Sequence, residues 1–205
     1  YAAALAAVPD LAGAQATLEA ALADLLDASW PQLQRVHGDY HLGQVLAAGP
    51  AHFLVIDFEG EPLRPLAERS HPEPALRDVA GMVRSFDYVA GTVETELGTP
   101  GGRAPWTAAA RAAFLGGYHR VAGSQPGDQA LLRALELDKA LYEVAYEAAN
   151  RPDWLPIPLA AVHALTATPA APDHTTLRDP SHRKTHMEPV QTSAQVADYS
   201  AVDAF

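Results

Sequence analysis

The fold is indicated by His37-Gly38-Asp39-Tyr40-His41-Leu42-Gly43-Gln44-Val45-Leu46, in which a carboxylate precedes a side-chain amide by five residues. A second stretch follows it, Phe53-Leu54-Val55-Ile56-Asp57-Phe58-Glu59-Gly60-Glu61-Pro62. In this second stretch an apolar run ends at Asp57. Asp39, Gln44 and Asp57 therefore place three side chains with carboxylate or amide oxygens within a short length of chain.

The two stretches also predict a local structure. Residues 45–46 and 53–56 are apolar runs, and the turn-prone Ala47-Ala48-Gly49-Pro50 lies between them. This pattern predicts a hairpin of two short strands. Because Gln44 precedes the first strand and Asp57 follows the second, both side chains are expected at the same mouth of the hairpin.

The order and spacing of these residues match a phosphoryl-transfer site. In protein kinases a catalytic Asp stands five residues before an amide that holds Mg²⁺, and a second metal-binding Asp ends a nearby strand. A hydroxyl is a weak nucleophile, so a carboxylate must orient it and accept its proton, a role that fits Asp39. Mg²⁺ takes oxygen ligands and shares them with substrate phosphates, so Asp57 and Gln44 suffice from the protein.

Other interpretations of the same residues stay open at this point. A Gly-Asp pair is common in turns, where the carboxylate satisfies backbone amides. His37, Asp39 and His41 could also form a His-x-Asp-x-His zinc cluster, since His and carboxylate are common zinc ligands. No further His cluster completes such a site. His37 is instead expected to hold the loop through backbone hydrogen bonds.

Four blocks of the sequence carry a resemblance to a known family: RVHGDYHLGQVL, VIDFEGEP, LRDVAGMVRSFDY and LELDKALYEVAYEAANRPDWLPIPL. In this order they resemble the C-terminal lobe of actinobacterial maltokinases, within the aminoglycoside-phosphotransferase-like, protein-kinase-like group. The similarity covers roughly residues 1–165. The resemblance implies transfer of phosphate from ATP, with Mg²⁺, to the C1 hydroxyl of maltose, giving maltose 1-phosphate for α-glucan synthesis.

Kinases of this group also have an N-terminal lobe with a phosphate-covering loop and a strand Lys. The chain has no Lys before Lys139 and no glycine-rich loop before His37. We therefore expect a fragment whose partner is the missing N-terminal lobe, and which has little or no activity alone.

The resemblance implies support for the catalytic loop from the helix that follows. Asp78 would accept hydrogen bonds from backbone amides of the loop and fix the angle of Asp39. An acidic side chain in the first turn of a helix can equally just complement the helix dipole. Arg84 lies on a similar face and could pair with a carboxylate of the site, but a solvated surface position explains it as well.

Carboxylates and aromatic rings are the expected partners of sugar hydroxyls and sugar C–H faces. Six residues are candidates for contact with the acceptor sugar: Glu59, Glu61, Tyr142, Glu143, Tyr146 and Trp154. Loop carboxylates such as Glu59 and Glu61 are more often only solvated. Tyr142 and Tyr146 share one helix face, so burial against the core is the simpler explanation for them.

Apolar periodicity predicts a mainly α lobe with one small β hairpin, an α+β fold. Helices are expected at residues 2–27, interrupted near Pro9, and at 76–89, 107–121 and 128–150. A Pro-rich connection joins the hairpin to the second helix. We expect one kinase-like lobe over residues 1–165 and a disordered tail over 166–205, where the composition shifts to Thr, Ala, Pro, Asp, His and Ser without apolar periodicity.

Composition excludes several classes of function. The net charge of −11 argues against nucleic-acid and anionic-membrane partners. The chain has no Cys and no apolar run long enough for a membrane span, so a cytoplasmic location is expected. Two alternatives to the maltokinase reading remain: a kinase for aminoglycosides or another sugar, and a non-catalytic module that docks on a partner such as a trehalose synthase.

Overall fold

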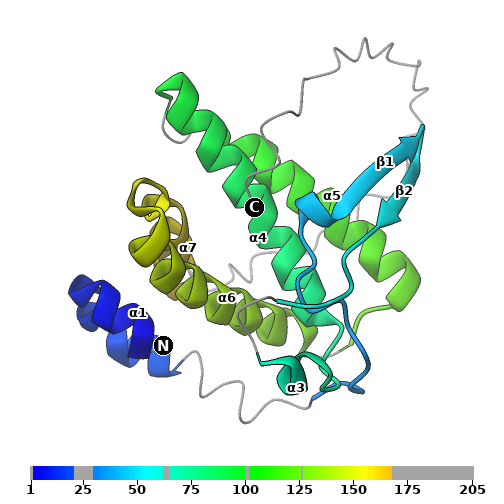
Figure 1. The fold of residues 1–205 in the computed structure, drawn as a ribbon, viewed down its shortest axis with the longest axis horizontal. Helices are drawn as coiled ribbons and strands as arrows, with labels where there is room; N and C mark the ends of the chain where they lie inside the picture. Colours follow the sequence, from blue (N-terminus) through cyan, green and yellow to red (C-terminus); the bar gives the residue numbers. More distant parts are fainter. Residues whose placement is uncertain (1, 21–29, 62–64, 100–101, 126, 168–205) are drawn as a thin grey trace, which may run out of the picture. The chain divides into compact units, whose positions relative to one another are not determined.

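The computed structural model describes residues 2–20, 30–61, 65–99, 102–125 and 127–167. This part of the chain is mainly helical and includes one two-stranded sheet, so the predicted fold class is confirmed (Figure 1). The elements run in the order α1 (Ala2–Ala7), η1 (Pro9–Ala14), η2 (Leu42–Gln44), β1 (Val45–Gly49), β2 (His52–Val55), α3 (Leu66–Arg69), α4 (Leu76–Leu97), α5 (Ala104–Ala122), α6 (Asp128–Asn150), η3 (Pro152–Trp154) and α7 (Pro156–Thr166).

The predicted hairpin is present as the antiparallel pair β1 and β2, drawn in cyan in Figure 1. Val45 lies opposite Val55, and the register shifts after Ala47. Beyond the ladder, the backbone N–H of Ile56 donates to the carbonyl of Gln44 at 3.0 Å. This hydrogen bond holds the two strands together at the end of the hairpin that carries Gln44 and Asp57.

Helices α4 and α6 pack against each other and form the centre of the lobe. Val79 and Val83 of α4 are buried with Leu131 and Leu135 of α6, which confirms the apolar face expected for the second helix. The helix runs eight residues further than predicted, to Leu97, and Gly98 closes it in a left-handed conformation with φ of 62°.

A second cluster packs the first segment and α7 onto the other half of α6. Leu11 and Leu18 are buried there with Val144 and Val162. The expected break near Pro9 is present, because α1 ends at Ala7 and a 3-10 helix follows. Residues 21–27 of the expected helix lie outside the described part of the chain.

Two helices, α3 and α7, were not predicted from the sequence. The short α3 lies within the Pro-rich connection, and α7 begins at Pro156, with Pro158 two residues later. Proline is tolerated in the first turn of a helix, where its missing N–H has no intrahelical partner. The predicted disordered tail falls, beyond Ala167, outside the described residues. None of the described helices is both long and apolar enough to cross a membrane.

Candidate active site

The loop that carries Asp39 rests on the first turns of α4. The carboxylate of Asp78 accepts hydrogen bonds from the backbone N–H groups of His37, at 2.7 Å, and Gly38, at 2.9 Å. One turn further along α4, a Cβ on Gly81 would lie only 2.6 Å from the carbonyl oxygen of Tyr40. Helix α4 therefore fixes this loop through one carboxylate and one position without a side chain.

His37 ties the same loop to the end of the hairpin. The ring of His37 is buried, and its Nε2 lies 2.7 Å from the carbonyl oxygen of Ile56. The other ring nitrogen, Nδ1, accepts a hydrogen bond from the backbone N–H of Asp39 at 3.3 Å. Both ring nitrogens are thus engaged with the backbone. Among the described residues no group of three His, Cys, Asp or Glu side chains could hold a metal ion. The structure therefore does not favour the zinc alternative.

The carboxylate of Asp39 lies between two nitrogen-bearing side chains. Its Oδ1 is 3.7 Å from Nζ of Lys139, and its Oδ2 is 3.9 Å from Nε2 of His41. Burial lowers the pKa of His41, so the imidazole is neutral near pH 7. Burial also opposes the charge of Lys139, but the carboxylates of Glu61 and Asp39 outweigh it and raise the pKa of Lys139. Asp39 therefore faces one permanent cation.

Gln44 and Asp57 meet at the mouth of the hairpin, as predicted from their places in the sequence. Nε2 of Gln44 lies 3.4 Å from Oδ2 of Asp57. Asp57 has a φ of 60°, a left-handed conformation that Asp and Asn tolerate better than most residues. One carboxylate and one amide fit a Mg²⁺ ion that takes its remaining ligands from nucleotide phosphates and water. They do not suffice for a metal held by protein side chains alone.

A narrow hollow of about 40 Å³ opens beside the loop of Asp39. Such a volume is far below that of a pocket enclosing a whole small molecule. Four carboxylates line the hollow: Asp39, Glu61, Asp78 and Asp138. Each has a partner, because Lys139 pairs with the first two, backbone amides bind the third, and Arg77 lies 3.4 Å from the fourth.

Aromatic rings continue from this hollow along α6. Tyr142 lines the hollow, and the ring of Tyr146 stacks on it with centroids 6.4 Å apart. The guanidinium of Arg151 lies over Tyr146 at 5.5 Å and over Trp154 at 4.6 Å. Three of the residues expected to contact the acceptor, Tyr142, Tyr146 and Trp154, are therefore linked by a ring stack and by the guanidinium of Arg151.

The remaining predicted residues are placed differently. Glu61 is buried and accepts a hydrogen bond from Lys139 at 2.8 Å, whereas Glu59 is exposed and does not line the hollow. Arg84 is not a solvated surface residue: it is only 1% exposed and pairs with Glu143 between α4 and α6. The carboxylate of Glu143 is thus committed to Arg84, and contact of Glu143 with a sugar stays a prediction.

Lys139 lies in this site but was not among the residues predicted from the sequence. A signal for it existed, because Lys139 precedes Tyr142 by three residues and so shares its helix face. Its ammonium lies 5.1 Å from the centroid of the Tyr142 ring. The pairing with Asp39 and Glu61 depends on how α6 docks beside the two loops, which the local sequence pattern does not contain.

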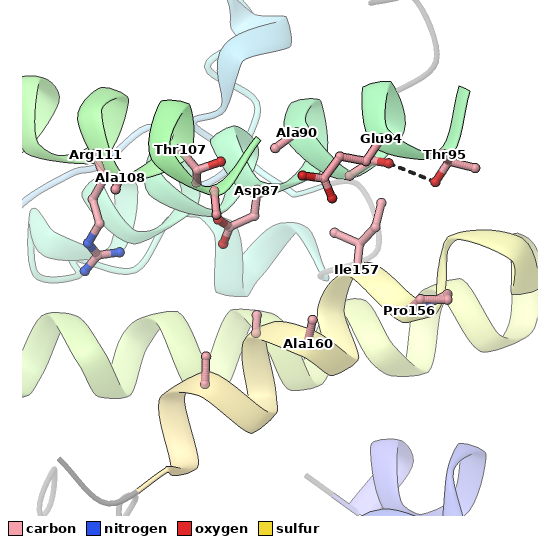
Figure 2. A pocket seen from close by; sticks show the side chains of 14 residues that line it. Asp87, Ala90, Glu94, Thr95, Thr107, Ala108, Arg111, Pro156, Ile157 and Ala160 are labelled. Atoms are coloured by element: carbon pink, nitrogen blue, oxygen red, sulfur yellow. Dashed lines mark hydrogen bonds between the residues drawn. The ribbon is translucent and has the colours of Figure 1, made fainter. Parts of the chain in front are cut away.

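A larger hollow of about 690 Å³ lies between α4, α5 and α7 (Figure 2). Alanines form much of its wall, among them Ala90, Ala108 and Ala160. Asp87 lines it as well, and burial raises the pKa of this carboxyl although Arg84 pairs with it. This hollow includes no residue singled out from the sequence.

Comparison with known proteins relates the chain to phosphate-transferring enzymes. A model of the phosphotransferase enzyme family matches residues 1–122. A glucosamine kinase of Mycolicibacterium smegmatis (strain ATCC 700084 / mc(2)155) is 39% identical over 154 residues, which are 72% of this chain and 38% of that protein. A glucosamine kinase of Streptacidiphilus jiangxiensis is 35% identical over 129 residues, 60% of this chain and 29% of that protein. The chain spans well under half the length of these curated relatives.

Solved structures give the same relationship. A glucosamine kinase in complex with glucosamine, ADP and inorganic phosphate is 27% identical with a TM-score of 0.56, over 79% of this chain and 48% of that chain. Crystal form B of a glucosamine kinase is 35% identical with a TM-score of 0.54, over 65% of this chain and 34% of that chain.

Proposed function

The chain belongs to the phosphotransferase enzyme family, and from this premise we propose that it carries the catalytic lobe of an ATP-dependent sugar kinase. The observation that carries the proposal is the placement of three side chains. Asp39 lies on a loop fixed by α4, while Gln44 and Asp57 meet at the mouth of the hairpin. These are the base and the metal ligands that phosphoryl transfer to a hydroxyl needs.

In the proposed reaction Asp39 orients the sugar hydroxyl and accepts its proton as the new oxygen–phosphorus bond forms and the bond to ADP breaks. Asp57 and Gln44 would hold Mg²⁺, which would neutralise charge on the nucleotide phosphates. Asp78 and His37 keep the loop in place through the backbone bonds described above. The solved relative with bound ADP supports ATP as the phosphoryl donor.

Two acceptors are supported by different observations. The resemblance of the four sequence blocks to maltokinases favours maltose. Each carboxylate that lines the hollow is paired, which also favours maltose, because a neutral sugar needs no free carboxylate. The names of the relatives favour glucosamine, whose ammonium would have to compete with Lys139 for Asp39 or Glu61. We propose maltose as the acceptor, with glucosamine as the second candidate.

The hairpin supports the further proposal that an N-terminal lobe completes the enzyme. Phe53, Leu54 and Phe58 expose 66%, 57% and 57% of their surface. Large apolar side chains exposed together on a hairpin and the segment that follows it are typical of a surface that another part of a protein covers. The hairpin also carries the predicted metal ligands, so a lobe packed there would close over the nucleotide phosphates.

The test is sugar phosphate formation from ATP with maltose, glucosamine and an aminoglycoside. It compares this chain, the chain extended by its native upstream coding sequence, and the extended chain carrying Asp39→Asn. We expect maltose 1-phosphate from the extended wild type alone, and a loss of at least about 100-fold in the variant. Glucosamine phosphate instead of maltose 1-phosphate would select the second candidate. An extended wild type that phosphorylates no sugar, or a fully active variant, would overturn the proposal.

A further inference from the structure

Lys139 is held at one place in the site by several contacts at once. Its Nζ donates to Glu61 at 2.8 Å and lies 3.7 Å from Oδ1 of Asp39. The ammonium also lies 5.1 Å from the centroid of the Tyr142 ring, within the range of a cation–π contact. A flexible lysine side chain is therefore fixed between the loop of Asp39, the loop of Glu61 and its own helix.

The environment of Lys139 keeps it charged. The carboxylates facing it come from three segments: Asp39, Glu61 and Glu143. His41 is the other nitrogen-bearing side chain beside Asp39, with Nε2 3.9 Å from Oδ2. Lys139 thus places an ammonium beside Asp39, and it comes from a helix 100 residues further along the sequence.

The two oxygens of Asp39 consequently have different surroundings. Oδ1 lies 3.7 Å from the ammonium of Lys139, whereas Oδ2 lies 3.9 Å from the imidazole Nε2 of His41. Both distances are longer than a hydrogen bond. A carboxylate anchored through one oxygen presents the other in a fixed direction. Such fixed geometry is what a general base needs to take a proton from a hydroxyl.

We propose that Lys139 is a positioning residue for phosphoryl transfer, which anchors Oδ1 of Asp39 to Glu61 and leaves Oδ2 to accept the proton of the sugar hydroxyl. This inference rests on the proposed function. Lys139 gains and loses no proton in the step. The proton passes from the sugar hydroxyl to Asp39, and the phosphoryl group passes from ATP to the sugar oxygen.

The first test is kinetic and uses the extended, active form of the enzyme. Lys139→Met removes the cation and keeps most of the stem, and Lys139→Arg restores the charge. We expect kcat to fall about 10- to 100-fold in the Met variant with the KM for ATP nearly unchanged, and to recover in part in the Arg variant. Arg133→Met is the matched control, because Arg133 is a cation of the same helix that binds the carbonyl of Leu165 instead.

The second test needs no activity. The chain has two lysines, Lys139 and Lys184, so lysine-selective ¹³C labelling gives two side-chain NMR signals. We expect Asp39→Asn to shift the Lys139 signal and leave that of Lys184 in place. An unshifted Lys139 signal, or a Lys139→Met variant that keeps the wild-type kcat, would overturn the role proposed for Lys139 but not the proposed function. An extended wild type inactive on every sugar would overturn the proposed function too, whatever the NMR signals show.

Discussion

Arg84 and Glu143 are joined by two hydrogen bonds across the interface of α4 and α6, 3.0 Å from Nε and 2.7 Å from Nη2 to the same carboxylate oxygen. Both side chains are almost fully buried. Burial opposes the charge on each, but the carboxylates of Glu143 and Asp87 raise the pKa of Arg84. The pair therefore joins the helix that holds the loop of Asp39 to the helix that carries Lys139.

Arg84→Met should destabilise the lobe strongly. The substitution leaves the carboxylate of Glu143 buried without its hydrogen-bonded cation, a change that typically costs about 3–5 kcal/mol. The free energy of unfolding is measured by urea titration monitored by circular dichroism. The double variant Arg84→Met with Glu143→Leu is the control, since removing both charges should recover most of the loss. A double variant no more stable than Arg84→Met would show that the guanidinium contributes by packing alone.

The cost of Arg84→Met should also depend on pH. Burial raises the pKa of the Glu143 carboxyl, and removal of Arg84 raises it further. A carboxyl whose folded pKa lies above its unfolded value of about 4.3 stabilises the fold while protonated, and this stability is lost as the pH rises through the folded pKa. We therefore expect a larger loss of stability at about pH 7.5 than at about pH 5. Equal losses at both pH values, each against wild type, would contradict this.

Asp78→Asn should reduce activity more than stability. The amide keeps one acceptor oxygen but cannot bind both the His37 and the Gly38 N–H groups as a carboxylate does. We expect kcat to fall about 10- to 100-fold in the active form, because Asp39 loses its fixed position. The control is Asp128→Asn, whose carboxylate accepts from the backbone N–H of Gln125 at 2.7 Å instead of from amides of this loop. Comparable losses of kcat in both variants would argue against a specific role for Asp78.

The features of the fold that were predicted from the sequence all involve residues that are close together in the chain. The hairpin follows from two apolar runs and a turn, and α6 was predicted with its bounds, Asp128–Asn150, because its apolar face repeats throughout. The meeting of Gln44 and Asp57 follows from the hairpin itself. These features depend on residues near each other in the chain, so local patterns suffice to predict them.

The parts that were missed depend on how distant segments pack. From the sequence alone, Arg84 cannot be told from an ordinary surface residue, because its pairing with Glu143 forms only when α4 and α6 pack together. Lys139 is recognisable as a site residue only once α6 lies beside Asp39 and Glu61. Helix α7 was missed for a different reason, since its two early prolines resemble a loop although the first turn of a helix accepts them.

Asp57→Asn should weaken the binding of Mg²⁺–ATP. Asn tolerates the left-handed conformation at this position, with φ of 60°, so the backbone is expected to stay in place. The charge that would hold the metal is lost, and we expect affinity for Mg²⁺–ATP to fall at least about tenfold in the extended form. Isothermal titration calorimetry with and without EDTA measures this. If the variant and wild type bind ATP equally in Mg²⁺, Asp57 is not the metal ligand.

Gly81→Ala should disturb the loop of Asp39 directly. The new Cβ would lie 2.6 Å from the backbone carbonyl oxygen of Tyr40, so either the loop or α4 must move. Because the clash involves the backbone, rotation of a side chain cannot relieve it. We expect a loss of about 1–3 kcal/mol in stability, together with a fall in kcat that exceeds what partial unfolding explains.

Gly116→Ala is the matched control for this prediction. Gly116 also lies within a helix, α5, but the nearest atom to its Cβ would be the end of the Arg120 side chain at 3.7 Å. Alanine should there stabilise the helix by about 0.5–1 kcal/mol, because glycine loses more backbone freedom on folding. Opposite signs for the two variants in urea unfolding would tie the cost at Gly81 to contact with Tyr40. Destabilisation of both by similar amounts would instead indicate a general intolerance of this lobe to larger residues in its helices.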